Sequence, residues 1–219
     1  MINRSLRRFW PNVKNDRILA IGYAPPVLGQ FQQTAERVIA AMPARQGVIQ
    51  WSGHAEDNQT LLVQDTQLPF PDVSMDKIIL IHSLEMTENA TPLLQECWRV
   101  LNNSGSLIVV VPNRRGIWAR NDRTPFGHGA PYTRFQLDRV LRDHLFDPTH
   151  YERTLFTPPV HSRLILSFAP LFQRIGARFF PRFCGVIVME AKKKLYAASI
   201  SSKAKKGRTG RGIPAISSP

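Results

Sequence analysis

The stretch Leu61–Pro112 constrains the fold of this chain more than any other part of the sequence. It holds three short apolar runs, Leu61–Val63, Lys77–Ile81 and Ser106–Val111, and an amphipathic segment separates the second run from the third. The runs are continuously apolar rather than alternating, which is typical of strands that are buried on both faces of a parallel sheet. The order strand, strand, helix, strand therefore predicts an α/β fold with helices on both faces of a mostly parallel sheet.

The N-terminal part of the chain extends this pattern. Arg17–Gly22 predicts a first buried strand. Two prolines, Pro25 and Pro26, suit the first turn of a helix, and the apolar spacing that follows predicts that this helix runs to about Ala41. The next apolar run, Gly47–Trp51, predicts the second strand.

Local signals mark the helices and strands of the C-terminal half. Asn89 or Thr91 suits the N-cap of the helix before Ser106–Val111. Thr133 with Gln136 forms a capping-box pattern and opens another helix. The last two strands are expected at Thr149–Phe156 and Val186–Glu190, and with these the sheet has seven strands, the last of them antiparallel.

Size and composition indicate a single domain in the cytoplasm. The 219 residues suffice for one large α/β domain. Cys97 and Cys184 have no metal-binding spacing, and a disulfide is not expected. The first residues lack the apolar run of a signal peptide. No run of about 20 apolar residues is present, so no transmembrane span is predicted.

The positive charge is concentrated at the C-terminus. The net charge is +13, and eight Lys and Arg residues but no acidic residue follow Glu190. We expect a basic N-terminal helix over 1–16, a main domain over 17–190 and a disordered basic tail over 199–219. The tail is either a solvated extension or a contact for nucleic acid or an anionic membrane. Residues 160–180 predict a helical cover, either over a sheet edge or on a membrane surface.

The predicted fold also predicts where a ligand binds. In open α/β sheets, ligands bind at the carboxyl ends of the strands. Asp65 follows the run Leu61–Val63, and His82 and Ser83 follow the run Lys77–Ile81. These polar side chains are therefore candidates for a binding site, and no metal site is predicted.

Three motifs carry a resemblance to a known family. The first is D-x-x-LPFPD-x-S-x-D over Asp65–Asp76, the second is H-x-LE over His82–Glu85, and the third is E-x-x-RVL with SG over Glu96–Gly105. In this order and spacing they resemble the class I S-adenosylmethionine-dependent methyltransferases with a type-11 methyltransferase domain. The resemblance covers about Arg17 to Glu190. Within the family, the chain resembles a bacterial subgroup of uncharacterised members. It implies a Rossmann-like fold and S-adenosyl-L-methionine as cofactor.

The resemblance also implies a division of labour among loops. The loop after the first strand holds the methionine part of the cofactor, and acidic residues after the second and third strands bind the ribose and the adenine. Residues after the fourth strand face the methyl group. Only Gly22 of the family's glycine motif is present, and the second strand as predicted ends without a carboxylate. The implied cofactor-binding residues are Gly22, Tyr23, Ala24, Gln50, Trp51, Asp65, Thr66, His82 and Ser83.

The reacting residues are less defined, because an activated sulfonium methyl group needs a base only when the acceptor carries a proton. His82 is the candidate for that base, and its alternative is a histidine bonded to loop backbone. The loop 113–132 is either a lid over the cofactor or a packing flap anchored by Trp118 and Phe126. Its candidate substrate contacts are Asn113, Arg114, His128 and Tyr132.

Two functional hypotheses follow. In the first, the protein transfers a methyl group to an unidentified acceptor, which we expect to be a small molecule. In the second, the altered glycine loop and the missing ribose carboxylate mark a methyltransferase fold that has lost catalysis. Such a protein would serve as a binding or scaffold module, with nucleic acid or a membrane as partner through its basic tail.

Overall fold

The computed structural model of the chain describes residues 1–44, 47, 49, 51, 59–116, 129–156 and 184–195. The predicted helical cover 160–180 and the basic tail 199–219 lie outside these residues. The elements are α1 Ile2–Phe9, β1 Arg17–Gly22, α2 Pro25–Leu28, β2 Arg37–Pro43, β3 Thr60–Val63, β4 Met75–Ile81, α3 Ala90–Val100, β5 Leu101–Pro112, α4 Arg134–Asp143, β6 Phe146–Thr154 and β7 Val186–Lys193.

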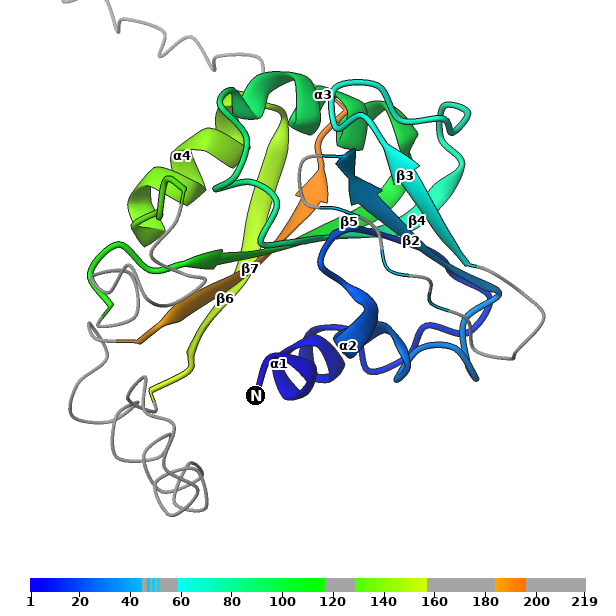
Figure 1. Cartoon of the computed structure of the whole chain (residues 1–219), viewed down its shortest axis with the longest axis horizontal. Coiled ribbons are helices and arrows are strands. Elements are labelled where there is room, and N and C mark those ends of the chain that lie inside the picture. Colours follow the sequence, from blue (N-terminus) through cyan, green and yellow to red (C-terminus); the bar gives the residue numbers. More distant parts are fainter. Residues whose placement is uncertain are drawn as a thin grey trace, which may run out of the picture.

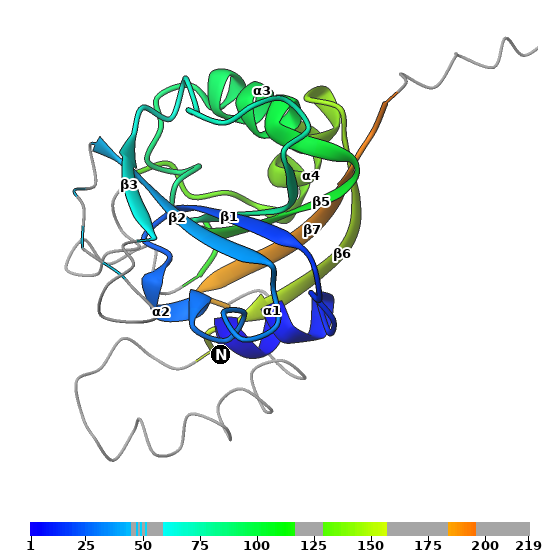
Figure 2. The same ribbon diagram turned by 90° about the vertical axis from the view of Figure 1, so that its right-hand side faces the viewer.

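Together the described strands form one seven-stranded sheet in the order β3-β2-β1-β4-β5-β7-β6, and the strands that are labelled in Figure 2, from β3 to β6, follow this order. The pairs β2–β3, β1–β2, β1–β4 and β4–β5 are parallel. β7 is antiparallel to β5 and to β6. The predicted Rossmann-like, mostly parallel sheet with an antiparallel last strand is therefore confirmed.

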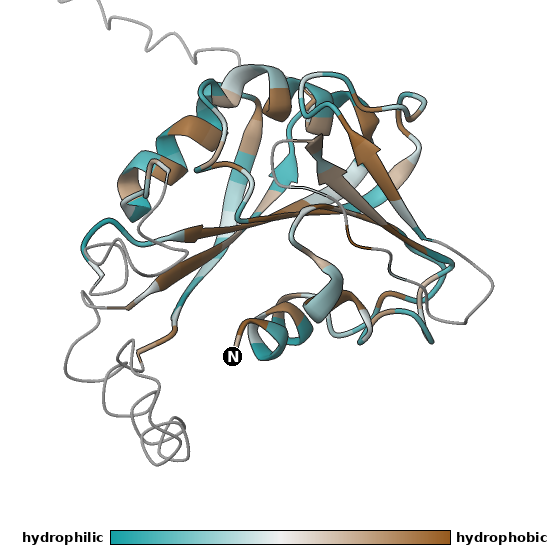
Figure 3. Cartoon of the chain, viewed as in Figure 1, coloured by the Kyte–Doolittle hydropathy of each residue, from teal (hydrophilic) through white to brown (hydrophobic). Residues whose placement is uncertain are grey.

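Helices cover both faces of this sheet. In Figure 1, α3 and α4 lie on one side of the sheet and α1 and α2 lie on the other. Each pair closes its own apolar cluster: Leu107, Val109 and Val111 of β5 face α3 and α4, whereas Ile108 and Val110 face α1 and α2. β5 is thus buried on both sides, as its unbroken apolar sequence predicted. The brown strands at the centre of Figure 3 show the same pattern.

The predicted second strand is wrong. The helix after the first strand ends at Leu28, and the chain then turns and enters β2 at Arg37. Among residues 47–51, the described ones (Gly47, Ile49 and Trp51) lie outside any strand. The run that starts with Val38 and Ile39 has a spacing that suits a helix, but β-branched residues also favour strands. Pairing with β1 on one side and β3 on the other decides for the strand.

The capping predictions are confirmed. The Asn89 side chain accepts a hydrogen bond from the Thr91 N–H and caps α3. The Thr133 hydroxyl accepts from the Gln136 N–H, and the Gln136 side chain accepts from the Thr133 N–H. These bonds satisfy backbone donors that have no partner inside a helix. The positions at which α3 and α4 begin are therefore fixed by local chemistry.

The basic N-terminal segment packs against the main sheet. Leu6 of α1 and the following Trp10 are buried in the cluster on the α1 and α2 side. The Trp10 Nε1–H donates a hydrogen bond of 2.9 Å to the buried Glu190 carboxylate on β7. In the part of the chain that the structure describes, no helix has the length and apolar character to cross a membrane.

Candidate functional site

The carboxyl ends of β1 and β4 meet at the centre of one edge of the sheet. Gly22, the last residue of β1, pairs with Ile81, the last residue of β4. Gly22 has a φ of +104°, and a Cβ at this position would overlap the carbonyl oxygen of Ile81 and crowd Ser83. Glycine is therefore required here both by conformation and by space. Of the next two residues, Tyr23 is exposed and Ala24 is buried.

Two buried polar atoms near this edge have no hydrogen-bond partner among the described residues. They are the Ser83 hydroxyl and Oε2 of Glu85. Ser83 is 3% exposed and the Glu85 side chain is 2% exposed. A buried polar group without a partner costs free energy, so such groups gather at functional sites. Their position directly after β4 marks this loop as a candidate ligand contact.

His82 and Glu85 form a close pair in the same loop. Nδ1 of His82 lies 2.7 Å from Oε1 of Glu85, and the His82 backbone has a φ of +50°. Ala130 donates its N–H to the Glu85 carbonyl oxygen, so the segment before α4 packs over this loop. Glu85 was grouped with a motif in the sequence, but its contact with His82 was not predicted. The spacing of three residues was the only signal for it.

The segment between β5 and α4 is tied together at its two ends. Asn113 forms a parallel bridge with Tyr132, and its Nδ2 donates to the Cys184 carbonyl oxygen at 2.9 Å. Arg114 Nε donates to the Pro131 carbonyl oxygen. Burial and the charge of Glu85 raise the pKa of the Tyr132 hydroxyl, and the charge of Arg114 acts against them. The fourth predicted substrate contact, His128, lies outside the described residues.

Asp65 and Thr66 lie in a turn directly after β3. Gln67 donates its N–H to the Gln64 carbonyl oxygen, so Asp65 and Thr66 are the two central residues of this turn. β3 and β1 are separated by β2, and neighbouring strands lie about 4.8 Å apart. Asp65 and Gly22 are therefore on the same edge, two strands apart across the sheet.

The other residues predicted near the second strand are differently located. Gln50 lies outside the described residues. Trp51 donates its N–H to the Thr60 hydroxyl at the first residue of β3, and it packs against the cluster on the α1 and α2 side. The expectation that the second strand ends at Trp51 is therefore wrong. β2 instead ends at Pro43 and is followed by Ala44, and the sequence holds no acidic residue between Glu36 and Glu56.

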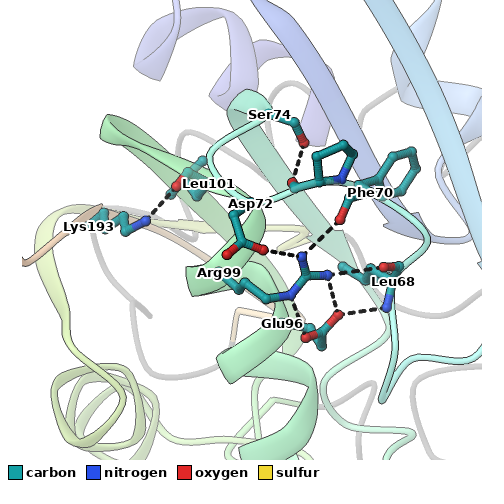
Figure 4. Close-up of polar contacts among 9 residues, drawn as sticks. Leu68, Phe70, Asp72, Ser74, Glu96, Arg99, Leu101 and Lys193 are labelled. Carbon is teal, nitrogen blue, oxygen red and sulfur yellow. Dashed lines mark hydrogen bonds and ion pairs between the residues drawn. The ribbon is translucent and has the colours of Figure 1, made fainter.

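Arg99 of α3 fixes the loop between β3 and β4 that follows the Asp65 turn (Figure 4). Its guanidinium donates to the carbonyl oxygens of Leu68 and Phe70 at 3.1 and 2.9 Å, and it pairs with Asp72 at 2.6 Å and with Glu96 at 2.7 Å. Glu96 also accepts from the Leu68 N–H. Glu96 and Arg99 of the E-x-x-R motif thus hold the β3–β4 loop against α3.

We call the contacts of Arg99 and Glu96 with the β3–β4 loop the Arg99 brace. Electrostatic interactions keep both of these side chains charged. The hydrogen bonds from Arg99 lower the pKa of the Glu96 carboxyl; burial opposes them, and the Leu68 N–H and the Arg99 charge add to the lowering. The hydrogen bond to Glu96 has the largest effect in raising the pKa of Arg99, and the hydrogen bond to Asp72 has the next largest. Both groups are ionised at neutral pH. In the described ranges, no group of three His, Cys, Asp or Glu side chains could hold a metal ion.

The sequence matches a family model described as a methyltransferase domain, over residues 21–109. No curated protein matches the chain significantly. The matched stretch runs from the end of β1 to the middle of β5, and it contains Gly22, the Asp65 turn, the loop after β4 and the Arg99 brace. The domain match therefore covers the edge of the sheet described above.

Solved structures with the same fold include several methyltransferases. An S-adenosylmethionine-dependent methyltransferase from Archaeoglobus fulgidus has a TM-score of 0.62 at 16% identity, over 88% of this chain and 93% of that one. One from Mesorhizobium loti has a TM-score of 0.62 at 14% identity, over 87% and 96%. Geranyl diphosphate C-methyltransferase from Streptomyces coelicolor, solved with Mg²⁺, geranyl diphosphate and S-adenosyl-L-homocysteine, has a TM-score of 0.59 at 13% identity, over 88% and 76%.

The Archaeoglobus fulgidus and Mesorhizobium loti proteins depend on S-adenosylmethionine, and the Streptomyces coelicolor enzyme was solved with S-adenosyl-L-homocysteine. The described edge agrees with that ligand at two points: the glycine that permits close approach at the end of β1, and the unpartnered Ser83 hydroxyl beside it. It departs at the end of β2, where a ribose-binding carboxylate is absent. Residues 21–109 match the model of a methyltransferase domain, and the described chain has the fold of these solved methyltransferases.

Proposed function

We propose that the protein is an active S-adenosylmethionine-dependent methyltransferase whose acceptor is a small molecule. The observation that carries the proposal is the convergence of Gly22, Ser83 and the His82–Glu85 pair where β1 and β4 end. Gly22, Tyr23 and Ala24 would hold the methionine part of the cofactor. Asp65 and Thr66 would contact the adenine, with Asp65 accepting from its amino group.

When bound, the cofactor supplies an activated sulfonium methyl group for in-line displacement, so much of the rate enhancement comes from positioning. The chain's contribution begins with Gly22, whose missing side chain lets a ligand approach the backbone. The Ser83 hydroxyl supplies a hydrogen bond at the same edge. The Arg99 brace acts at a distance by holding the loop next to the Asp65 turn.

His82 would act as the base for an acceptor that carries a proton. The buried Glu85 carboxylate fixes the imidazole through Nδ1, so the second ring nitrogen is the one that takes the proton. A base is needed for a hydroxyl or a protonated amine but not for a nucleophile that is already anionic. The His82–Glu85 pair therefore favours an acceptor that loses a proton during methyl transfer.

Calorimetric titration with S-adenosyl-L-homocysteine tests the proposal. We expect micromolar binding in the natural chain, weakened about tenfold or more in Asp65→Ala. Asp143→Ala removes an exposed carboxylate on α4 and should leave binding unchanged. Absence of binding up to millimolar ligand would contradict the proposal and favour the scaffold alternative. If the cofactor product binds, transfer of a labelled methyl group into fractionated extract identifies the acceptor.

The cysteines bear on the compartment. Cys97 and Cys184 are both buried and unpaired. Burial raises the pKa of the Cys184 thiol to about 11, although the Arg153 charge and the Asn113 amide act in the opposite direction. Neither thiol is therefore an easily ionised nucleophile. Free thiols are typical of a reducing compartment, and we propose that the protein works in the cytoplasm.

A further inference from the structure

A cavity of about 200 Å³ lies beside the end of β5, on the side of the sheet that α4 covers. Its described lining consists of Asn113 and Arg115 after β5, Thr133, Arg134 and Phe135 at the start of α4, Arg153 on β6 and Ile187 on β7. Pockets for whole small molecules usually measure about 300–1,000 Å³. The cavity is therefore of a size for one functional group of a ligand rather than for a cofactor.

Three of the lining residues are arginines, and none of the described lining residues is acidic. Within the described part of the chain, Arg115, Arg134 and Arg153 form no ion pair, whereas Arg17, Arg99 and Arg142 each have a carboxylate partner. Like charges that share one cavity repel each other unless an anion joins them. The cavity thus has an excess of positive charge and of hydrogen-bond donors.

Two of the three guanidinium groups contact an aromatic ring. The Arg134 guanidinium carbon lies 3.6 Å from the centre of the Tyr151 ring, and that of Arg153 lies 5.8 Å from it. Tyr151 and Arg153 are two residues apart on β6, so they point to the same face of the sheet. Stacking occupies the flat face of a guanidinium and leaves its in-plane N–H donors available. The donors of Arg134 and Arg153 are therefore positioned before any ligand arrives.

We propose that this cavity binds a phosphate group, and that the phosphate is carried by the methyl acceptor. Three guanidinium groups match a phosphate dianion better than a carboxylate of single charge. The cavity and the His82 loop lie at the ends of neighbouring strands, because the His82 N–H donates to the Val110 carbonyl oxygen of β5. The second part of this inference rests on the proposed function; the binding of phosphate does not.

Titration with inorganic phosphate at fixed ionic strength tests the site itself. We expect saturable binding in the natural chain and a loss of about tenfold or more in Arg134→Gln with Arg153→Gln. Arg139→Gln removes one positive charge from the exposed side of α4 and should bind as the natural chain does. Because Arg134 and Arg153 also pack on Tyr151, the exposed Arg115→Gln provides a second variant that should weaken binding without a change in thermal stability.

Two results would overturn the site: no saturable phosphate binding up to tens of millimolar, or equal binding in the Arg134→Gln, Arg153→Gln double variant. S-adenosyl-L-homocysteine is titrated in parallel, since its binding depends on the β1 and β4 edge. Phosphate binding without S-adenosyl-L-homocysteine binding would refute the proposed function alone. S-adenosyl-L-homocysteine binding without phosphate binding would refute the phosphate site alone.

The source of the phosphate is tested by methyl transfer into small-molecule extract. If the acceptor carries the phosphate, phosphatase treatment of the extract abolishes the labelled product, and the double variant raises KM for the acceptor more than it lowers kcat. Labelling that survives phosphatase and is unaffected by the double variant would overturn the acceptor assignment. A site for free phosphate would then be the remaining interpretation.

Discussion

Nδ1 of His82 lies 2.7 Å from Oε1 of Glu85, and the two residues differ sharply in exposure: the His82 side chain is 23% exposed and that of Glu85 is 2%. The carboxylate is thus buried, whereas the imidazole that it contacts is partly exposed to solvent. A carboxylate accepts hydrogen bonds but cannot donate them, so the proton of a neutral imidazole belongs on Nδ1. The lone pair then resides on Nε2.

This arrangement predicts the tautomer of His82. In long-range ¹H–¹⁵N NMR spectra, the natural chain should show the Nδ1–H form, because the Glu85 carboxylate favours it. Glu85→Gln should shift the population toward Nε2–H, the form usually preferred by a free imidazole. The exposed His150 is an internal reference whose signals should not change. An Nε2–H form in the natural chain would refute the proposed role of Glu85.

Gly22 predicts a strong and site-specific intolerance to a side chain. Gly22→Ala should destabilise the fold by at least about 2 kcal/mol, because it combines a left-handed conformation with overlap on the Ile81 carbonyl oxygen. Gly29→Ala is the matched control: its φ is −54° and no atom lies within 4 Å of an added Cβ. Urea unfolding measures both variants. Equal stability of the two would contradict the close packing of β1 against β4.

The Arg99 brace predicts a pH-dependent contribution to stability. The pKa of Glu96 is lowered in the folded chain from its usual value of 4.5. Its ionised form therefore stabilises the fold above about pH 4.5, and this contribution is lost as the pH falls through the lower folded-state pKa. Glu96→Gln should cost about 1–2 kcal/mol near neutral pH, and the difference from the natural chain should shrink in acid.

Urea unfolding over a pH series measures this difference. Glu36→Gln alters an exposed carboxylate and serves as the control. A Glu96→Gln penalty that stays constant from neutral to acidic pH would mean that the charge of Glu96 does not contribute.

The contact between Trp10 and Glu190 predicts that the N-terminal helix stabilises the sheet. Trp10→Phe keeps an aromatic ring in the cluster but removes the Nε1–H that donates to the buried carboxylate. We expect a loss of about 1–3 kcal/mol. Adding Glu190→Gln removes the buried charge, so the two effects should not be additive. Additive losses in thermal unfolding would show that the two side chains do not act as a pair.

Much of the fold could be predicted from the sequence because its signals are local. The runs that became β1, β4 and β5 are continuously apolar, which is typical of strands covered on both faces. The Thr133 capping box depends on residues three apart in the chain. Asp65 and His82 follow their strands directly in sequence, so their position at the sheet edge followed from the strand assignments.

The second strand could not be assigned in this way. The segment from Val27 to Met42 has apolar residues at a spacing that suits a helix, and its second half also reads as a strand. The choice was made by pairing, since Arg37–Pro43 fills the space between β1 and β3. The resulting error moved the expected ribose-binding position to Gln50 and Trp51, whereas the strand ends at Pro43.

By itself, the sequence determined where most strands lie along the chain, the caps of α3 and α4 and the polar residues that follow β3 and β4. Each of these features depends on neighbours along the chain. Only the tertiary structure decided which segment became β2, and it alone brought Arg115, Arg134 and Arg153 to one cavity. These three residues lie on different elements and show no common pattern in sequence. Their proximity results from the packing of α4 and β6 against the sheet.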